Sequence, residues 1–254
     1  MFPSGEGLWY YSRMKQFLPF RGADRTTRPG KQLSAAIPLL QNGDCLTQPE
    51  FHRRYEAYPD DTKFELIGGI VYMASPQRLP HGKYSVKMAR VLDHYTDETP
   101  GVETSHDTTT ILGHATEPQP DLNLRIVEEY GGQSKVNDEL YILFAPELLM
   151  EIAHSTVSID MNQKREEYRK AGVVEYVVIC IEEEQLHWFD FKANRELPAD
   201  CNGIFRSRVF PGLWIDSKAV FVLNSRQLAK TLRKGLASEE HARFVKRLKS
   251  MRQQ

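Results

Sequence analysis

The feature that most constrains the fold is a nearly continuous apolar run, Leu148-Leu149-Met150-Glu151-Ile152-Ala153. A short run without polar alternation is typical of a strand that is covered on both faces. The carboxylate of Glu151 stands in the middle of this run, where losing its hydration costs several kcal/mol unless a cation or hydrogen bonds compensate. A metal ion is one such cation, and a structural ion pair is the alternative.

The surrounding sequence predicts a fold of the α/β class (α+β mixed). In this fold, a mixed β-sheet is flanked by helices. Thr47-Gln48-Pro49-Glu50 has the pattern of a capping box and predicts a helix through Tyr55. Gly68-Gly69 divides the strand pattern of 64–73 and indicates a hairpin. Periodicity and turn residues predict the remaining elements: helices over 81–96 and 159–171, and strands over 102–112, 119–127, 146–153 and 173–181.

Composition limits the class of protein. The 33 Lys and Arg side chains nearly balance the 34 Asp and Glu side chains, which argues against a basic DNA coat protein and against an acidic solvating protein. A hydrophobic content of 41% excludes wholesale disorder. No apolar run approaches the ~18 residues of a membrane span, so we expect no membrane partner. Three widely spaced cysteines without a CxxC motif favour a reducing cytoplasm.

The two ends of the chain differ from its middle, so we expect three parts. Residues 1–43 mix Gly, Pro, Ser and Arg without a sustained period and predict a flexible N-terminal extension. Residues 44–222 carry the α/β pattern and predict the domain itself. Residues 223–254 predict a basic helical C-terminal tail, with nine Lys and Arg against two Glu from residue 226 onward, a net charge of +7. This tail is interpreted either as a solvated helix that packs its leucines on the core or another subunit, or as a contact to a phosphate backbone.

A second candidate site residue, Asp121, lies in the stretch 119–127, where polar and apolar residues alternate. This alternation predicts a strand that places Asp121 on a face in contact with water. An ordinary surface strand with a polar outer face is the alternative explanation of the same pattern.

A third candidate, Lys164, falls between Met161 and Tyr168 on the inward stripe of the predicted helix 159–171. A simple i,i+4 ion pair with Asp160 is the alternative explanation for this lysine.

Taken together, these residues have the chemistry of a metal-dependent phosphoryl-transfer site. Asp121 and Glu151 are expected on adjacent strands, with Lys164 on the following helix leaning over their ends. Two carboxylates suit Mg²⁺, which keeps several waters and binds phosphate oxygens. An ammonium group beside them can stabilise the charge that builds on a transferring phosphoryl group, or position the attacking water.

Several motifs, in this order along the chain, resemble a known family. They are Phe64-Glu65-Leu66-Ile67-Gly68-Gly69, Ser75-Pro76 followed by His81-Gly82, Pro120-Asp121, Glu151-Ile152-Ala153, Ser155-Thr156, Lys164, Tyr168, Ala171-Gly172-Val173 and Glu175-Tyr176. Together they resemble the Uma-type restriction endonucleases, a branch of the PD-(D/E)XK nucleases, over roughly residues 47–222. The resemblance implies a restriction-endonuclease-like core whose carboxylates hold a divalent metal, Mg²⁺ or Mn²⁺.

The resemblance also implies roles for individual residues. Asp121 would be the motif aspartate and Glu151 the second acidic metal ligand, while Lys164 would be the family's lysine, moved to the next helix. Glu65 would be an additional acidic site residue, and His81 a second-shell or phosphate-contacting group, with a satisfied structural histidine as the alternative. The chain departs from the family pattern at Gly68-Gly69-Ile70, where Asp-Gly-Glu is usual.

Two classes of function follow from these residues. The first is a Mg²⁺-dependent endonuclease that hydrolyses DNA phosphodiester bonds, with DNA as its partner and a homodimer left open. The second is a catalytically inactive nucleic-acid- or protein-binding module that retains the nuclease fold.

Overall fold

A six-stranded mixed sheet forms the centre of the computed structural model, which describes residues 37–59 and 62–252. The strands lie in the order β11-β10-β9-β8-β5-β3. In that order they span Arg195–Glu196, Gln185–Asp190, Glu175–Cys180, Leu148–Ala153, Leu122–Ile126 and Val102–His106. β8 and β9 pair in parallel, and the other neighbours pair antiparallel. The α/β fold with a mixed sheet flanked by helices is therefore confirmed.

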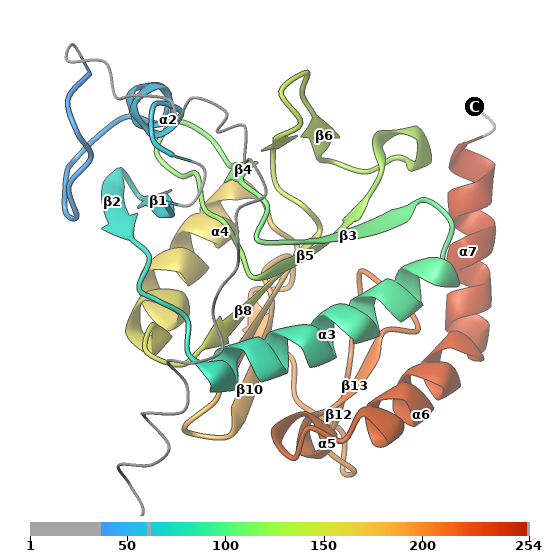
Figure 1. The fold of residues 1–254 in the computed structure, drawn as a ribbon. Coiled ribbons are helices and arrows are strands. Elements are labelled where there is room, and N and C mark those ends of the chain that lie inside the picture. Colours follow the sequence, from blue (N-terminus) through green and yellow to red (C-terminus); the bar gives the residue numbers. More distant parts are fainter. Residues whose placement is uncertain (1–36, 60–61, 253–254) are drawn as a thin grey trace, which may run out of the picture.

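The apolar strand β8 is covered on both faces, as its sequence predicts. Leu148, Met150 and Ile152 enter the main core beneath α3 (Leu79–Asp97), which crosses the sheet in Figure 1. Leu149 and Ala153 enter a second core on the opposite face. That second face is covered by a π-helical segment, η3 (Ile159–Lys164), which continues into α4 (Arg165–Ala171). Because side chains alternate along a strand, Glu151 faces the same side as η3 and α4.

A smaller core lies beside the sheet. It gathers Phe51 of α2 (Gln48–Tyr55) with Phe64 and Val71 of the hairpin β1 (Phe64–Ile67) and β2 (Ile70–Met73). The predicted helix and hairpin are therefore present, although the Thr47 side chain makes no capping hydrogen bond. Leu40 is also buried in this core, so packing begins before residue 44, while residues 1–36 of the predicted extension lie outside the described residues.

Short strands and turns complete the fold. β4 (Thr110–Ile111), β7 (Ile142–Leu143) and β6 (Lys135–Val136) form a three-stranded sheet, and β12 (Ile204–Arg206) pairs with β13 (Trp214–Asp216). A 3₁₀ turn, η2, spans Glu128–Tyr130. None of the helices within residues 37–59 and 62–252 combines the length and apolar character that crossing a membrane requires.

Two strand predictions need correction. The single strand expected over 102–112 is divided into β3 and β4, which belong to different sheets, because the backbone at Asp107 takes a positive φ of 51° and turns the chain. The polar face of β5 does not meet water. Asn123 donates to Ser105 Oγ at 2.6 Å and Arg125 to Glu103 Oε2 at 2.8 Å, so β3 satisfies these buried groups.

The C-terminal segment is helical, and it packs on the domain. After α5 (Ser217–Phe221), it forms α6 (Ser225–Leu236) and α7 (Glu239–Met251). In Figure 1, α6 lies below α3, and α7 stands at the right, beyond the end of α3. Its apolar stripe, Leu228, Leu232, Phe244 and Leu248, is buried in the main core. The apolar residues of this segment therefore pack on the core, while a contact of its basic residues to a phosphate backbone stays a prediction.

Glu175, at the start of β9, is a buried residue whose carboxylate connects β9 to neighbouring parts of the chain. Its two carboxylate oxygens accept four hydrogen bonds, from Trp188 Nε1 at 2.9 Å, Ser207 Oγ at 2.7 Å, and the backbone N–H groups of Arg208 at 2.6 Å and Val209 at 3.1 Å.

A Glu175→Gln variant is therefore expected to be less stable. A glutamine has one acceptor oxygen, so two of the four donors lose their partner, at a cost of about 2–3 kcal/mol. Urea unfolding of the variant measures this loss, and Glu183→Gln, on an exposed turn, is the control. Equal unfolding free energies for the two variants would contradict the role given to Glu175.

Candidate active site

Asp121 and Glu151 lie directly opposite each other on neighbouring strands. The antiparallel register of β5 and β8 pairs Leu122 with Met150, which brings the preceding Asp121 opposite Glu151. Asp121 N–H donates to Glu151 Oε2 at 3.4 Å, and Ile152 N–H donates to Asp121 Oδ2 at 2.7 Å. The structure therefore places both carboxyl groups on the sheet face that η3 and α4 cover.

Lys164 points into the same place from the last residue of η3. Its Nζ lies 3.1 Å from Glu151 Oε1 and 3.0 Å from Glu65 Oε2. The Asp160 carboxylate, one helical turn earlier, is 3.7 Å away. Lys164 thus lies beside the Glu151 carboxylate and is also the i,i+4 partner of Asp160, so the ion pair expected from the sequence is present within the same cluster.

The remaining two sequence-predicted residues also reach this cluster. Glu65, on β1, holds Lys164 and accepts a hydrogen bond from Gln119 N–H at 2.8 Å. His81, in the first turn of α3, places its Nε2 3.1 Å from Asp121 Oδ1. The buried Nδ1 of His81 has no hydrogen-bond partner within the described residues. Five side chains, from β1, α3, β8, η3 and the residue just before β5, therefore form one cluster.

Sequence reasoning gave no site role to three further residues of the cluster. Tyr168 Oη donates to Glu151 Oε1 at 2.8 Å, and Tyr176 Oη donates to the backbone carbonyl of Asp160 at 3.0 Å. Asp160 also accepts from Thr156 Oγ1 at 2.5 Å. The i,i+4 spacing of Asp160 and Lys164 was the available signal, but that spacing alone does not tell a buried pair from an exposed one.

Burial and mutual charge shift the protonation equilibria of the cluster. Burial raises the pKa of Glu151 well above the usual carboxyl value, and burial likewise raises the pKa of Asp160. For Lys164, burial opposes the charge, but the neighbouring Glu151 and Glu65 carboxylates outweigh it and raise the pKa. Burial also opposes ionisation of Asp121, yet the hydrogen bond from His81 prevails and lowers the pKa of Asp121.

The donor set fits a divalent cation. The cluster holds four carboxyl groups, from Glu65, Asp121, Glu151 and Asp160, against one lysine and one histidine. Such an excess of buried carboxyl groups needs additional positive charge before all of them can ionise. Mg²⁺ is bound in proteins through one or two carboxylates, with waters and phosphate oxygens filling its other positions. Asp121 and Glu151 supply two such carboxylates.

Comparison with known proteins identifies the family of this chain. The model of the Uma2 family, described as "Putative restriction endonuclease", matches residues 49–218. The chain belongs to the Uma2 family. The matched range contains every residue of the cluster, from Glu65 to Tyr176. The Uma-type resemblance of the sequence motifs is thereby confirmed, and family membership supports a nuclease function.

A solved structure shares the fold of this Uma2 protein. It is the crystal structure of a putative nuclease belonging to DUF820 from Anabaena variabilis ATCC 29413, with 15% sequence identity and a TM-score of 0.54. The similarity covers 70% of this chain and 98% of that chain. At this identity, the likeness establishes the fold. The search of curated proteins found no significant match.

Proposed function

We propose that this Uma2 protein is a Mg²⁺- or Mn²⁺-dependent endonuclease that hydrolyses DNA phosphodiester bonds at the Asp121–Glu151–Lys164 cluster. One observation carries the proposal. Two buried carboxylates that lie opposite each other on neighbouring chain segments share a cluster with a lysine ammonium 3.1 Å from Glu151. Carboxylates that hold a divalent cation beside a fixed positive charge form the arrangement that phosphoryl transfer requires.

The residues of the cluster are proposed to have different roles. Asp121 and Glu151 would hold the cation, which when bound neutralises phosphate charge and activates water. Tyr168 fixes the Glu151 carboxylate through its hydroxyl, and Glu65 holds Lys164 in place. Lys164 is then positioned to stabilise the developing negative charge on the phosphoryl group or to orient the attacking water.

His81 is proposed to orient Asp121 or to contact a substrate phosphate. Its Nε2 is bound to Asp121, and its pKa is raised because the Asp121 hydrogen bond outweighs the effect of burial. A protonated imidazole here adds positive charge beside the cluster.

The competing function is a binding module that kept the fold and lost catalysis. The ion pairs of Lys164 with Glu65, Glu151 and Asp160 also suit a purely structural cluster. Cleavage of covalently closed plasmid separates the two functions, because an endonuclease produces nicked and linear DNA, whereas a binding module only retards the plasmid on a gel. Loss of activity with a chelator then shows the metal requirement.

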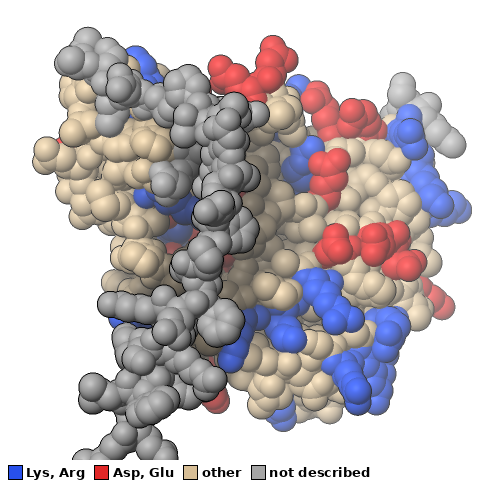
Figure 2. Space-filling view, in the orientation of Figure 1, with Lys and Arg blue, Asp and Glu red and all other residues tan. Residues whose placement is uncertain are grey.

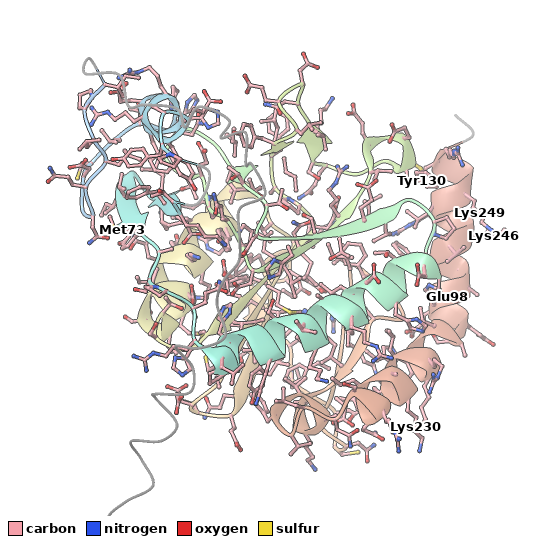
Figure 3. The ribbon with its side chains drawn as sticks, viewed as in Figure 1. Met73, Glu98, Tyr130, Lys230, Lys246 and Lys249 are labelled. Atoms are coloured by element: carbon pink, nitrogen blue, oxygen red, sulfur yellow. The ribbon has the colours of Figure 1, made fainter. Side chains whose placement is uncertain are left out.

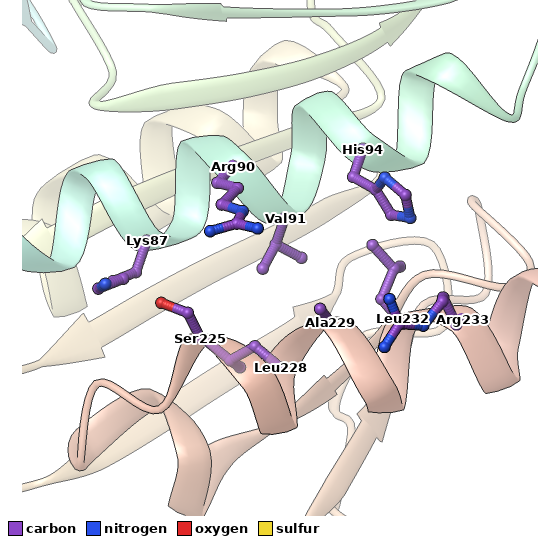
Figure 4. Close-up of a pocket in the computed structure, with 9 residues that line it drawn as sticks. All are labelled: Lys87, Arg90, Val91, His94, Ser225, Leu228, Ala229, Leu232 and Arg233. Atoms are coloured by element: carbon purple, nitrogen blue, oxygen red, sulfur yellow. The ribbon is translucent and has the colours of Figure 1, made fainter.

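A basic surface beside the cluster is proposed to hold the DNA backbone. α3 and α6 enclose a groove lined by Lys87, Arg90 and His94 on one side and Arg233 on the other (Figure 4). Figure 2 shows Lys and Arg gathered over α6 and the adjoining part of α3. Figure 3 shows Lys230 extending from α6, and Lys246 and Lys249 from the outer side of α7.

The charges of this surface are available to a polyanion. Within the described residues, Lys87, Arg90 and Arg233 line this groove without a carboxylate partner, whereas Lys63, Lys135 and Lys170 are each paired with one. Lys87 and Arg90 lie on the same helix as His81, about 9 and 14 Å further along its axis. A DNA strand on this groove would therefore run toward the cluster.

Substituting Lys87 and Arg90 together with alanine is expected to weaken DNA binding and flatten its salt dependence. Each lost phosphate contact changes the slope of log affinity against log salt by about 0.9. Binding titrations at three salt concentrations measure this slope, and Lys135→Ala, which removes one paired surface charge, is the control. An unchanged slope in the double variant would place the DNA elsewhere.

The cellular setting is proposed from the cysteines. Cys45, Cys180 and Cys201 are all free thiols, which is consistent with a reducing cytoplasm. A homodimer stays a prediction.

A further inference from the structure

A second group of metal-ligating side chains lies away from the nuclease cluster, between α2 and the turn that joins β6 to β7. His52 and Glu56 are one helical turn apart on α2, and Glu139 belongs to the turn. One ligand atom from each of the three residues lies within 4.8 Å of the other two.

The histidine of this group is held in the orientation that metal ligation needs. His52 Nδ1 is 2.8 Å from Glu117 Oε1, and the Glu117 side chain is fully buried. Glu117 is itself fixed by Gln48 Nε2 at 2.8 Å and by two backbone hydrogen bonds to Leu66. A histidine that donates Nδ1–H to a carboxylate presents the lone pair of its Nε2, which is the arrangement found behind metal-ligating histidines. Here Nε2 faces Glu56, with Oε1 3.8 Å away.

The turn that carries Glu139 is also fixed against His52. Asn137 closes it by accepting from Tyr141 N–H at 2.8 Å and donating from its own N–H to the Tyr141 carbonyl at 3.0 Å. The Tyr141 ring then packs edge-on against the His52 ring, with 5.0 Å between centroids. The chain thus brings a third ligand from a distant part of the sequence to the same imidazole.

The charge of the surroundings favours a cation. The adjoining pocket, of about 210 Å³, is lined by His52, Glu56, Glu117 and Tyr141 among others, and its lining in the described part of the chain includes no lysine or arginine. Three carboxylates therefore surround a single imidazole.

We propose that His52, Glu56 and Glu139 bind a divalent transition-metal ion of the Zn²⁺ class, with Glu117 as the residue that positions His52. An imidazole nitrogen together with two carboxylates suits Zn²⁺, whereas Mg²⁺ prefers oxygen ligands alone. Zn²⁺ at about 2.0–2.1 Å from its ligands holds them about 3.3 Å apart. Closing the group from 4.8 Å to that size requires the exposed Glu56 and Glu139 side chains to turn toward His52 Nε2. The ion would join α2 to the β6–β7 turn, and its ligands are separate from those proposed for the nuclease metal.

Calorimetric titration of the full chain with Zn²⁺, in an excess of Mg²⁺, tests this site. We expect one Zn²⁺ per chain that His52→Gln and Glu139→Gln each weaken by more than tenfold. Glu117→Gln should weaken it by about 10–100-fold, the effect of losing an outer-shell partner. Glu139 lies on an exposed turn, so its variant tests the site even where His52→Gln disturbs folding, which circular dichroism reports.

Two controls separate this site from other Zn²⁺ contacts. His187→Gln removes a histidine that is paired with Glu196 at 2.8 Å but belongs to no three-residue ligand group within the described residues, and it should leave Zn²⁺ affinity unchanged. Glu151→Gln should also leave it unchanged, so the outcome does not depend on the proposed nuclease. Absence of Zn²⁺ binding by the parent chain, or equal affinities of the parent, His52→Gln and Glu139→Gln, would overturn the proposal and leave His52 as a structural ion-pair partner.

Discussion

Replacing Lys164 with alanine is expected to slow DNA cleavage by about 10³-fold, the usual effect of removing a fixed charge-stabilising group from a reaction centre. The ammonium lies within 3.1 Å of Glu151 and Glu65 and is buried, so bulk water does not replace it. Single-turnover cleavage of plasmid at saturating enzyme isolates this effect from DNA binding. A Lys164→Ala protein that cleaves at the parent rate would exclude a catalytic role for the lysine.

The same substitution tests folding as well as catalysis, so a second variant is needed. Without Lys164, the buried Glu65, Glu151 and Asp160 lose their shared cation, and breaking a buried pair of this kind costs about 3–5 kcal/mol. Lys164→Arg keeps the charge and is expected to stay closer to the parent stability. It should still impair turnover, because a broad planar guanidinium replaces a compact ammonium.

Glu151→Gln is expected to abolish metal-dependent cleavage, with a loss of at least about 10³-fold, because several kcal/mol of metal-derived stabilisation disappears. The amide can still accept the hydrogen bond from Tyr168, so the cluster keeps its shape. Thermal unfolding with and without Mg²⁺ provides an independent measurement. The parent midpoint should rise with Mg²⁺, since a ligand that binds only the folded state stabilises it. A matching rise in Glu151→Gln would show that the ion binds elsewhere.

The pH dependence of the metal-free protein gives the control for Glu151. Because burial raises the pKa of this carboxyl in the folded state, its protonated form favours folding. That contribution is complete below the unfolded pKa of about 4.3 and is lost as pH rises through the folded pKa. Glu151→Gln removes the ionisable group. The parent should therefore lose unfolding free energy relative to the variant as pH rises above the unfolded pKa and through the raised folded pKa.

The parts of the site that depend on local pattern were predictable from the sequence. A carboxylate inside an apolar run identified Glu151, because burial on both faces follows from composition alone. Helical periodicity placed Lys164 on the inward-facing side of the predicted helix. The family motifs added Glu65 and His81, which no local pattern distinguishes from surface residues.

The parts that depend on distant packing were not predictable in the same way. The polar face of β5 is buried because β3 supplies Ser105 and Glu103 to its polar groups, and the alternation of the strand contains no information about that partner. Asp107 divides one expected strand because its backbone adopts a positive φ, which few non-glycine residues do. Likewise, His52 and Glu139 lie far apart in sequence, and only the fold brings them together.

The central claim is that the Asp121–Glu151–Lys164 cluster hydrolyses DNA with a divalent metal. Its most direct test is the cleavage of covalently closed plasmid by parent, Asp121→Asn and Lys164→Ala proteins purified in parallel, with Mg²⁺, Mn²⁺ or a chelator. We expect nicked and linear products from the parent with either metal, none with the chelator, and at most trace products from the two variants. Equal cleavage by parent and variants, or an intact plasmid with the folded parent under both metals, would contradict metal-dependent hydrolysis at this cluster.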